Sequence, residues 1–577
     1  MADEHIREAL VSRIRVWTLC VVFVLCCTAS AQEPRAGESI EVSIVNVEVH
    51  VTDKQGNRVT GLRAEDFEIR ENGKAQPITN FSEYESAGSA GTAAVEAAPG
   101  SATGAEEAPP RLRRSIVIFI EPVTLANFRT KELFDSIRTL LRRTVEKGDQ
   151  VSIVTFVRAT RVRQPFTDDM ASIDAALAAL EKEMSGVEGN TYDESKFVLE
   201  EAAYFEKEYE EALSQLGFGL PGGTAVSMDV LAAARRQRFL IRQKTAALEA
   251  LVQSISGADG RKILVMATRR FGLYAGAEYF GGSVPPEYRQ ELDTAQYRQS
   301  LIATANANGV TIYPVHPEGL QNTSHNGPSV SGQYRMESTL DQDLSRASYD
   351  NTVLLNESAA LEEVAVATGG ASAWGSASIA KLLPRVGDDL ESYYSLAYRA
   401  TATGKDGARR IAVTTKNPAY VVRSRKQFVE KSETTQIKDR VRSNLFQRVE
   451  GSSAPIPFDV AVGTIKKTGR KRWAVPLKIR IPIANLTTLP RGPEESGTFS
   501  VFFATGGVLG VMSDVEQRSQ QFTIPRGEIA RAKSSHFTYD LELTIDQLVK
   551  SLSIAVMDDV GKEFGLKRYE LPKTAKE

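Results

Sequence analysis

The sequence predicts an α/β protein with a doubly wound, mostly parallel central sheet, flanked by a small N-terminal β module and a C-terminal β-sandwich. Three observations predict this class. Continuous apolar runs of strand length, such as residues 116–120, alternate with helical patterns, as buried parallel strands do. Strictly alternating runs, at residues 45–51 and 477–481, precede and follow that region, as half-buried strands do. Residues 86–112, poor in bulky apolar side chains, separate the first unit from the second.

Composition and charge exclude several classes of function. The chain has 577 residues, of which 42% are hydrophobic and 25% charged, and this length predicts roughly three or four domains of about 150 residues. Lys and Arg number 70 against 73 Asp and Glu, so we expect no nucleic-acid partner, because phosphate binding needs a basic excess or patch. The 3 cysteines stand at positions 20, 26 and 27, which excludes thiol catalysis and disulfide frameworks from the rest of the chain.

Residues 1–31 have the pattern of a secretory signal. A positively charged flank precedes an apolar run of about a dozen residues, and residues 29–31 form a small-x-small cleavage site. The run is shorter than the ~20 apolar residues of a spanning helix. We therefore expect a secreted or periplasmic protein with no integral membrane span after cleavage. An uncleaved anchor, or a lipid anchor on Cys26 or Cys27, is the alternative.

The N-terminal β module is predicted at residues 38–85. An alternating strand at residues 45–51 is followed by turn-forming Asp, Asn and Gly, and shorter strands follow around residues 67–70 and 78–84. Residues 86–112 then form a flexible linker, because they have too few bulky side chains to pack.

The α/β domain is predicted at residues 113–430. Its expected strands lie at residues 116–120, 151–156, 263–267 and 310–315, with helical spacings between them, and β-rich runs from residue 393 to residue 423 close it. Two insertions interrupt the pattern: a charged helical excursion at residues 186–240 and a mobile loop at residues 318–356. Residues 456–572 alternate again and predict the C-terminal β-sandwich.

Three groups of motifs resemble one family, the bacterial, chiefly acidobacterial, VWFA-related domain proteins, distant relatives of the von Willebrand factor type A domain. Residues 49–56, 59–62, 65–67 and 71–74 resemble its N-terminal module. Residues 260–262, 309–315, 368–370 and 388–398 resemble its α/β core, and residues 554–561 its C-terminal β region. The resemblance runs in order over most of the chain after residue 31.

The resemblance implies binding of partners, typically proteins, through a divalent metal at a site called MIDAS. That site takes an Asp-x-Ser-x-Ser loop after the first strand, because a hard cation prefers oxygen ligands and keeps one position for a partner's carboxylate. Here the loop departs from the motif. Glu121 keeps a carboxylate, but Val123 and Leu125 replace the two hydroxyls, and Thr124 and Asn127 offer oxygens out of register.

The other two MIDAS loops depart as well. The Thr of the second loop corresponds to Thr191 or Thr224, and the sequence does not choose between them. The third loop, Thr268-Arg269-Arg270, has no acid where the motif has Asp. A guanidinium is always charged and repels a metal cation.

We therefore expect a degenerate site without metal or other cofactor, with Mg²⁺ as the open alternative. The hypothesis is that Arg269 or Arg270 pairs with Glu121 and takes the metal's place. Glu121, Asn127 and the two arginines are the candidate binding surface. The alternative is that these residues have no specific role, Glu121 being a solvated loop residue and the two arginines surface charges.

The sequence gives little indication of enzymatic activity. It has no His-Glu-x-x-His, Gly-x-Ser-x-Gly or Gly-x₄-Gly-Lys-Ser/Thr motif, and the pair His316 and His325 is a weak metal signal. We predict an exported, non-enzymatic binding or adhesion-type protein that engages a protein or an envelope macromolecule. The alternatives are an envelope-associated structural or assembly component, and a hydrolase with a site built from scattered carboxylates and His316.

Overall fold

The computed structural model describes residues 42–85, 113–122, 130–157, 159–184, 228–280, 284–316, 340–373, 383–401, 403–446, 456–470, 472–507, 512–546 and 549–571. The expected signal segment, the linker and most of the insertion at residues 186–240 lie outside these ranges. No helix among the described residues has the length and apolar character that crossing a membrane takes.

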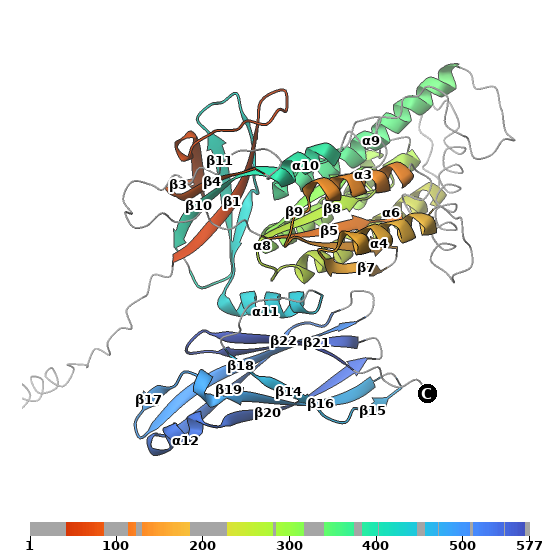
Figure 1. Ribbon diagram of the computed structural model, residues 1–577. Helices are drawn as coiled ribbons and strands as arrows, with labels where there is room; N and C mark the ends of the chain where they lie inside the picture. Colours follow the sequence, from red (N-terminus) through yellow and green to blue (C-terminus); the bar gives the residue numbers. More distant parts are fainter. Residues whose placement is uncertain are drawn as a thin grey trace, which may run out of the picture. The chain divides into compact units, whose positions relative to one another are not determined.

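A five-stranded sheet forms the centre of the α/β region (Figure 1). Its strands, in spatial order, are β7 (Thr160–Thr167), β6 (Gln150–Phe156), β5 (Arg114–Ile120), β8 (Arg261–Ala267) and β9 (Val310–Val315). All neighbours run parallel except the edge strand β7, which is antiparallel to β6. The predicted doubly wound, mostly parallel sheet is thus confirmed. Strand β7 is an addition, because its half-exposed residues give no apolar run.

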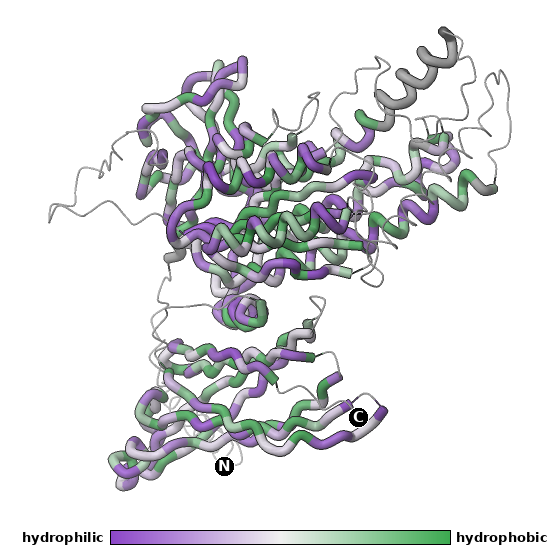
Figure 2. The backbone as a smooth tube through the Cα atoms, turned by 45° about the vertical axis from the view of Figure 1, so that its right-hand side comes forward, coloured by the Kyte–Doolittle hydropathy of each residue, from purple (hydrophilic) through white to green (hydrophobic). Residues whose placement is uncertain are grey.

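Helices cover both faces of this sheet. One face packs against α3 (Thr130–Thr144), α4 (Met170–Met184) and α10 (Leu383–Glu391), and the other against α6 (Met228–Ser254), α8 (Ala295–Asn308) and α9 (Leu340–Thr368). Along β5, Ile116, Ile118 and Ile120 enter the first core, while Val117 and Phe119 enter the second. Such two-sided burial explains the continuous apolar run, and the central strands are among the hydrophobic parts of the chain in Figure 2.

Two helices differ from the sequence-based expectations. Helix α6 begins inside the expected insertion at residues 186–240 and continues without a break to Ser254. Helix α9 begins at Leu340, inside the expected loop at residues 318–356, so that interpretation was wrong for its second half. The physical reason is local: residues 333–368 contain no Gly or Pro, so nothing in them ends a helix, whereas Gly369 does, with φ of +87°.

The N-terminal β module is completed by strands from beyond the α/β region. Its two sheets have the orders β12-β1-β10-β4 and β13-β11-β2-β3. Their strands are β1 (Val42–Thr52), β2 (Phe67–Glu71), β3 (Lys74–Gln76), β4 (Ile78–Glu85), β10 (Ser392–Thr401), β11 (Gly407–Thr415), β12 (Val421–Arg423) and β13 (Gln427–Glu430). This pairing corrects the expectation that residues 393–423 close the α/β domain. The cause is β10, whose Tyr394, Leu396 and Tyr398 share a core with the valines of β1.

The C-terminal region is the predicted β-sandwich. One sheet contains β14 (Asp459–Val462), β15 (Lys466–Gly469), β16 (Arg472–Pro482) and β20 (His536–Asp546). The other contains β17 (Leu489–Arg491), β18 (Glu494–Gly507), β19 (Glu516–Pro525), β21 (Val549–Asp558) and β22 (Phe564–Glu570). Alternate residues of β16, β18 and β21 fill one common core. Helix α11 (Glu433–Asn444), which the sequence interpretation left unassigned, packs Ile437 and Val441 on the outer side of β18 and β21.

Candidate functional site

The candidate site lies at the carboxyl edge of the central sheet. Glu121, Thr268 and His316 each follow directly after a strand, β5, β8 and β9 respectively. Because neighbouring parallel strands end at the same edge, the three residues are brought together, and ligands of such sheets bind at this edge. The ladder continues one residue beyond the strands: the Glu121 N–H donates to the Ala267 carbonyl at 3.2 Å, and the Thr268 N–H to the Val315 carbonyl at 3.3 Å.

The structure places a cation of helix α6, Lys244, on Glu121. The Lys244 Nζ lies 2.7 Å from the Glu121 Oε2 and donates to the Thr268 Oγ1 at 3.0 Å and to the Arg269 carbonyl at 2.7 Å. The Thr268 hydroxyl in turn donates to the Glu121 Oε2 at 2.6 Å. The Lys244 side chain is 3% exposed and that of Glu121 8%. The three N–H groups of the ammonium therefore face three oxygens in a buried setting.

This arrangement does not fit a divalent metal. A carboxylate, a hydroxyl and a backbone carbonyl are oxygen ligands of the kind that a hard cation takes. Here all three already contact the Lys244 ammonium at 2.7–3.0 Å, so a second cation on the same oxygens meets a positive charge at contact distance. The hypothesis of a protein cation on Glu121 considered Arg269 and Arg270, and the structure adds a lysine of α6 that contacts the same carboxylate.

Arg269 and Arg270 lie in the loop after β8, half-buried. The backbone of Arg270 has φ of +54°, a left-handed conformation that is uncommon for a residue other than glycine. Buried side chains hold this backbone: the Gln237 Nε2 donates to the Arg270 carbonyl at 3.1 Å, and the Arg270 N–H donates to Glu357. A strained backbone that its surroundings fix is typical of functional loops.

A second buried pair joins β9 to helix α9. The His316 Nε2 lies 2.8 Å from the Glu357 Oε2, and the two side chains are 1% and 4% exposed. Burial alone raises the pKa of Glu357, but the hydrogen bond and charge of His316, with Arg269 nearby, overcome it and lower that pKa to about 2. Glu357 is therefore ionised at neutral pH and holds both His316 and the loop after β8.

The remaining candidates from the sequence lie outside the described residues. These are Thr124 and Asn127 of the first loop, and Thr191 and Thr224 of the second. Glu121 and Thr268 are the two predicted positions that the structure brings into contact.

The sequence interpretation missed Lys244 and Glu357. A signal for Lys244 existed, because it stands in the apolar stripe of α6 between Ile241 and Leu248, where a lysine must bury its ammonium or find a partner. Glu357 gave no such signal, since it stands directly after residues 318–356, which were interpreted as a mobile loop.

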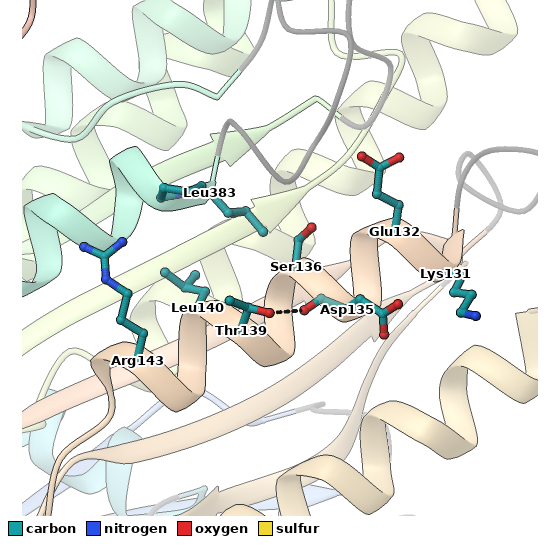
Figure 3. Close-up of a pocket in the computed structure, with 9 residues that line it drawn as sticks. Lys131, Glu132, Asp135, Ser136, Thr139, Leu140, Arg143 and Leu383 are labelled. Carbon is teal, nitrogen blue, oxygen red and sulfur yellow. Dashed lines mark hydrogen bonds between the residues drawn. The ribbon is translucent and has the colours of Figure 1, made fainter.

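A cavity of about 520 Å³ lies beside α3 and the start of α10 (Figure 3). Its lining residues are Lys131, Glu132, Asp135, Ser136, Thr139, Leu140, Arg143, Leu383 and Pro384. Arg143 is engaged by Asp388 and Glu391, and Asp135 by Arg138, so these charges neutralise one another within the protein. Over the described parts of the chain, no group of three or more His, Cys, Asp or Glu side chains is placed to hold a metal ion.

Comparisons with known proteins give likeness in structure and none in sequence. No protein-family model matches the chain, and no curated protein sequence does. The conserved hypothetical protein BatB from Bacteroides thetaiotaomicron is similar over 48% of this chain and 97% of its own, at 9% identity and a TM-score of 0.21. The PilB minor pilin from Streptococcus sanguinis covers 61% of this chain and 88% of its own, at 11% identity and a TM-score of 0.21.

A third solved structure is that of proximal thread matrix protein 1 from the mussel byssus. It covers 48% of this chain and 48% of its own length, at 12% identity and a TM-score of 0.21. That structure has a zinc-occupied MIDAS motif, which is a property of the mussel protein.

Proposed function

We propose that this chain is an exported, non-enzymatic binding protein that engages a protein or envelope macromolecule through the loops at the carboxyl edge of its central sheet. The observation that carries the proposal is the state of that edge. Its ionisable side chains form two buried pairs, in which Lys244 contacts Glu121 and His316 contacts Glu357. They hold the strand ends and the loop after β8 in place, which suits a rigid platform for recognition.

The same contacts speak for binding and against the hydrolase alternative. The His316 ring is buried at the end of β9, and its Nε2 is committed to a carboxylate. A general base needs hydrogen-bond reach to a substrate proton. We assign His316 a positioning role, with no cofactor. Export rests on the signal pattern at residues 1–31, and secreted or periplasmic localisation is part of the proposal.

The test is identification of a partner, followed by measurement of its affinity. The full-length exported protein, immobilised, captures binding proteins from an envelope fraction, and the Kd of a captured candidate is then measured with purified components. Substitution Arg269→Ala/Arg270→Ala is expected to weaken binding by about 30-fold, since interface arginines that act as hot spots contribute about 2 kcal/mol or more.

The matched control for this test is Lys466→Ala/Lys467→Ala, which removes two exposed cations from strand β15 of the sandwich. It is expected to leave the Kd unchanged. Equal Kd values for wild type and the double arginine variant would place the binding surface elsewhere and contradict the proposal.

A further inference from the structure

We infer that the Lys244 ammonium is the resident cation of the carboxyl edge and takes the place of a divalent metal there, so that Glu121 after β5 and Thr268 and Arg269 after β8 are held without metal. The inference deepens the proposed function and rests on it only for what that edge binds. For everything else it rests on the geometry of the site, where one ammonium contacts three oxygen acceptors at 2.7–3.0 Å and is almost completely buried.

The first argument is connectivity. Glu121 follows β5, Thr268 and Arg269 follow β8, and Lys244 reaches them from helix α6. These residues come from three separate elements, and the ammonium is in contact with both strand ends. A metal ion at a MIDAS joins separate loops in the same way, by collecting their oxygens around one positive centre. Removing the ammonium therefore takes a positive charge away from the buried Glu121 carboxylate and breaks the contacts that join the two strand ends.

The second argument comes from a half-buried lysine of the same domain. Lys262, in strand β8, has its Nζ 3.3 Å from the Ser256 carbonyl and 3.1 Å from the Ala258 carbonyl. Burial lowers the pKa of Lys262 to about 8. Its hydrogen bonds go to two backbone carbonyls, so partial burial of a lysine in this domain does not by itself bring a carboxylate and a hydroxyl around the ammonium. The oxygen set around Lys244 is a particular feature of the carboxyl edge.

The test uses the purified full-length protein without any partner. Titration calorimetry of wild type with MgCl₂, MnCl₂ and CaCl₂ is expected to show no saturable site, and EDTA is expected to leave the Tm unchanged. Lys244→Ala removes the ammonium and opens space beside the three oxygens. We expect this variant to have a lower Tm that Mn²⁺ raises by several degrees and EDTA lowers again, because an ion that binds only the folded state stabilises it.

Two controls separate this effect from general destabilisation. Lys262→Ala also loses a hydrogen-bonded, half-buried ammonium, and its Tm is expected to fall without any response to Mn²⁺. Lys244→Ala/Glu121→Ala lacks the carboxylate and is expected to show no Mn²⁺ response either. Saturable binding of a divalent metal at a single site of the wild type would overturn the inference. So would a folded Lys244→Ala variant whose Tm does not change when Mn²⁺ is added.

A further variant covers the case in which Lys244→Ala does not fold. Lys244→Met/Glu121→Leu replaces both members of the ion pair by apolar side chains, whereas Lys244→Met leaves the carboxylate buried without the ammonium, so the Tm of the double variant is expected to lie well above that of Lys244→Met alone. Equal Tm values for these two variants would show that Lys244 and Glu121 are not coupled and would overturn the inference. Since no partner enters these measurements, their failure leaves the proposed binding function standing, and failure to find a partner leaves this inference standing.

Discussion

The two edges of the central sheet both bury charged side chains, but they pair them differently. At the carboxyl edge, one lysine meets a carboxylate, a hydroxyl and a carbonyl. At the amino edge, arginines at the starts of β5 and β8 do the pairing: Arg114 binds Asp149 through its Nε at 3.0 Å, and Arg261 binds Glu48 at 2.8 Å. Both guanidinium groups also donate to the Leu390 carbonyl, at 2.9 and 3.4 Å.

The choice of cation fits a different role at each edge. A guanidinium has five donors in a rigid plane and can bond several elements at once, whereas an ammonium is a compact point charge. The arginines of the amino edge bond β1, the segment before β6 and the end of helix α10, where a cation also complements the helix dipole. That edge is structural. The carboxyl edge gathers oxygen atoms around one small cation, as a ligand site does.

The largest expected effect comes from breaking the amino edge. The Arg114 side chain is 0% exposed, and Arg114→Met leaves the Asp149 carboxylate buried without its cation. We expect a loss of about 3–5 kcal/mol in the free energy of unfolding, measured by urea denaturation. Arg143→Met is the control, because Arg143 also binds two carboxylates, Asp388 and Glu391, but is 37% exposed. Its expected cost is about 1 kcal/mol or less, and equal costs for the two variants would contradict the comparison.

The next effect is an acid sensitivity of the amino edge. Burial lowers the pKa of His50 to about 4, against the opposing charge of Asp389, whose carboxylate lies 3.5 Å from the ring. Arg423 and Arg261 also face the ring and favour its neutral form, while Glu48 opposes them. The folded protein therefore binds a proton at His50 more weakly than the unfolded chain does, whose pKa is about 6.5.

The direction in which stability changes with pH follows from the difference in proton binding between the folded and unfolded states. The stability contributed by the neutral His50 is fully present above pH 6.5 and is lost as the pH falls from about 6.5 to about 4, by about 3 kcal/mol in total. Urea denaturation between pH 4 and pH 7 measures this slope. His50→Gln, which carries no titrating ring, is expected to have a flatter profile across that window. An unchanged slope in His50→Gln would assign the acid sensitivity to other groups.

The pattern of apolar side chains determined which parts of the fold could be predicted from the sequence. Strands β5, β6, β8 and β9 are buried on both faces, so their residues form continuous runs that the sequence displays. The partners of β10 could not be predicted, because its alternation fits any half-buried strand and nothing local says which sheet receives it. The pairing with β4, which includes the stacked rings of Tyr84 and Tyr393 at 5.0 Å, becomes visible only in three dimensions.

The candidate site, like the fold, could be predicted only in part. The strand ends at Glu121 and Thr268 follow from the strand runs, so their meeting at one edge could be predicted. The identity of the cation could not, because Lys244 lies more than a hundred residues from Glu121 in the chain and enters from a helix whose first half was taken for an insertion. Charge alone favoured the arginines, which are nearer in the sequence to Thr268.

The smallest expected effect is at an exposed pair of the sandwich, and it sharpens the contrast between buried and solvated charge. Lys478 of β16 and Asp540 of β20 face each other across the strands with Nζ and Oδ1 3.9 Å apart, but their side chains are 59% and 71% exposed. Water already solvates both charges, and salt screens their attraction. Asp540→Ala is therefore expected to change the free energy of unfolding by about 0.5 kcal/mol or less in urea, with the effect shrinking further as NaCl is added. A loss as large as that of Arg114→Met would mean that pairing, and not burial, sets the cost of removing a charge from this protein.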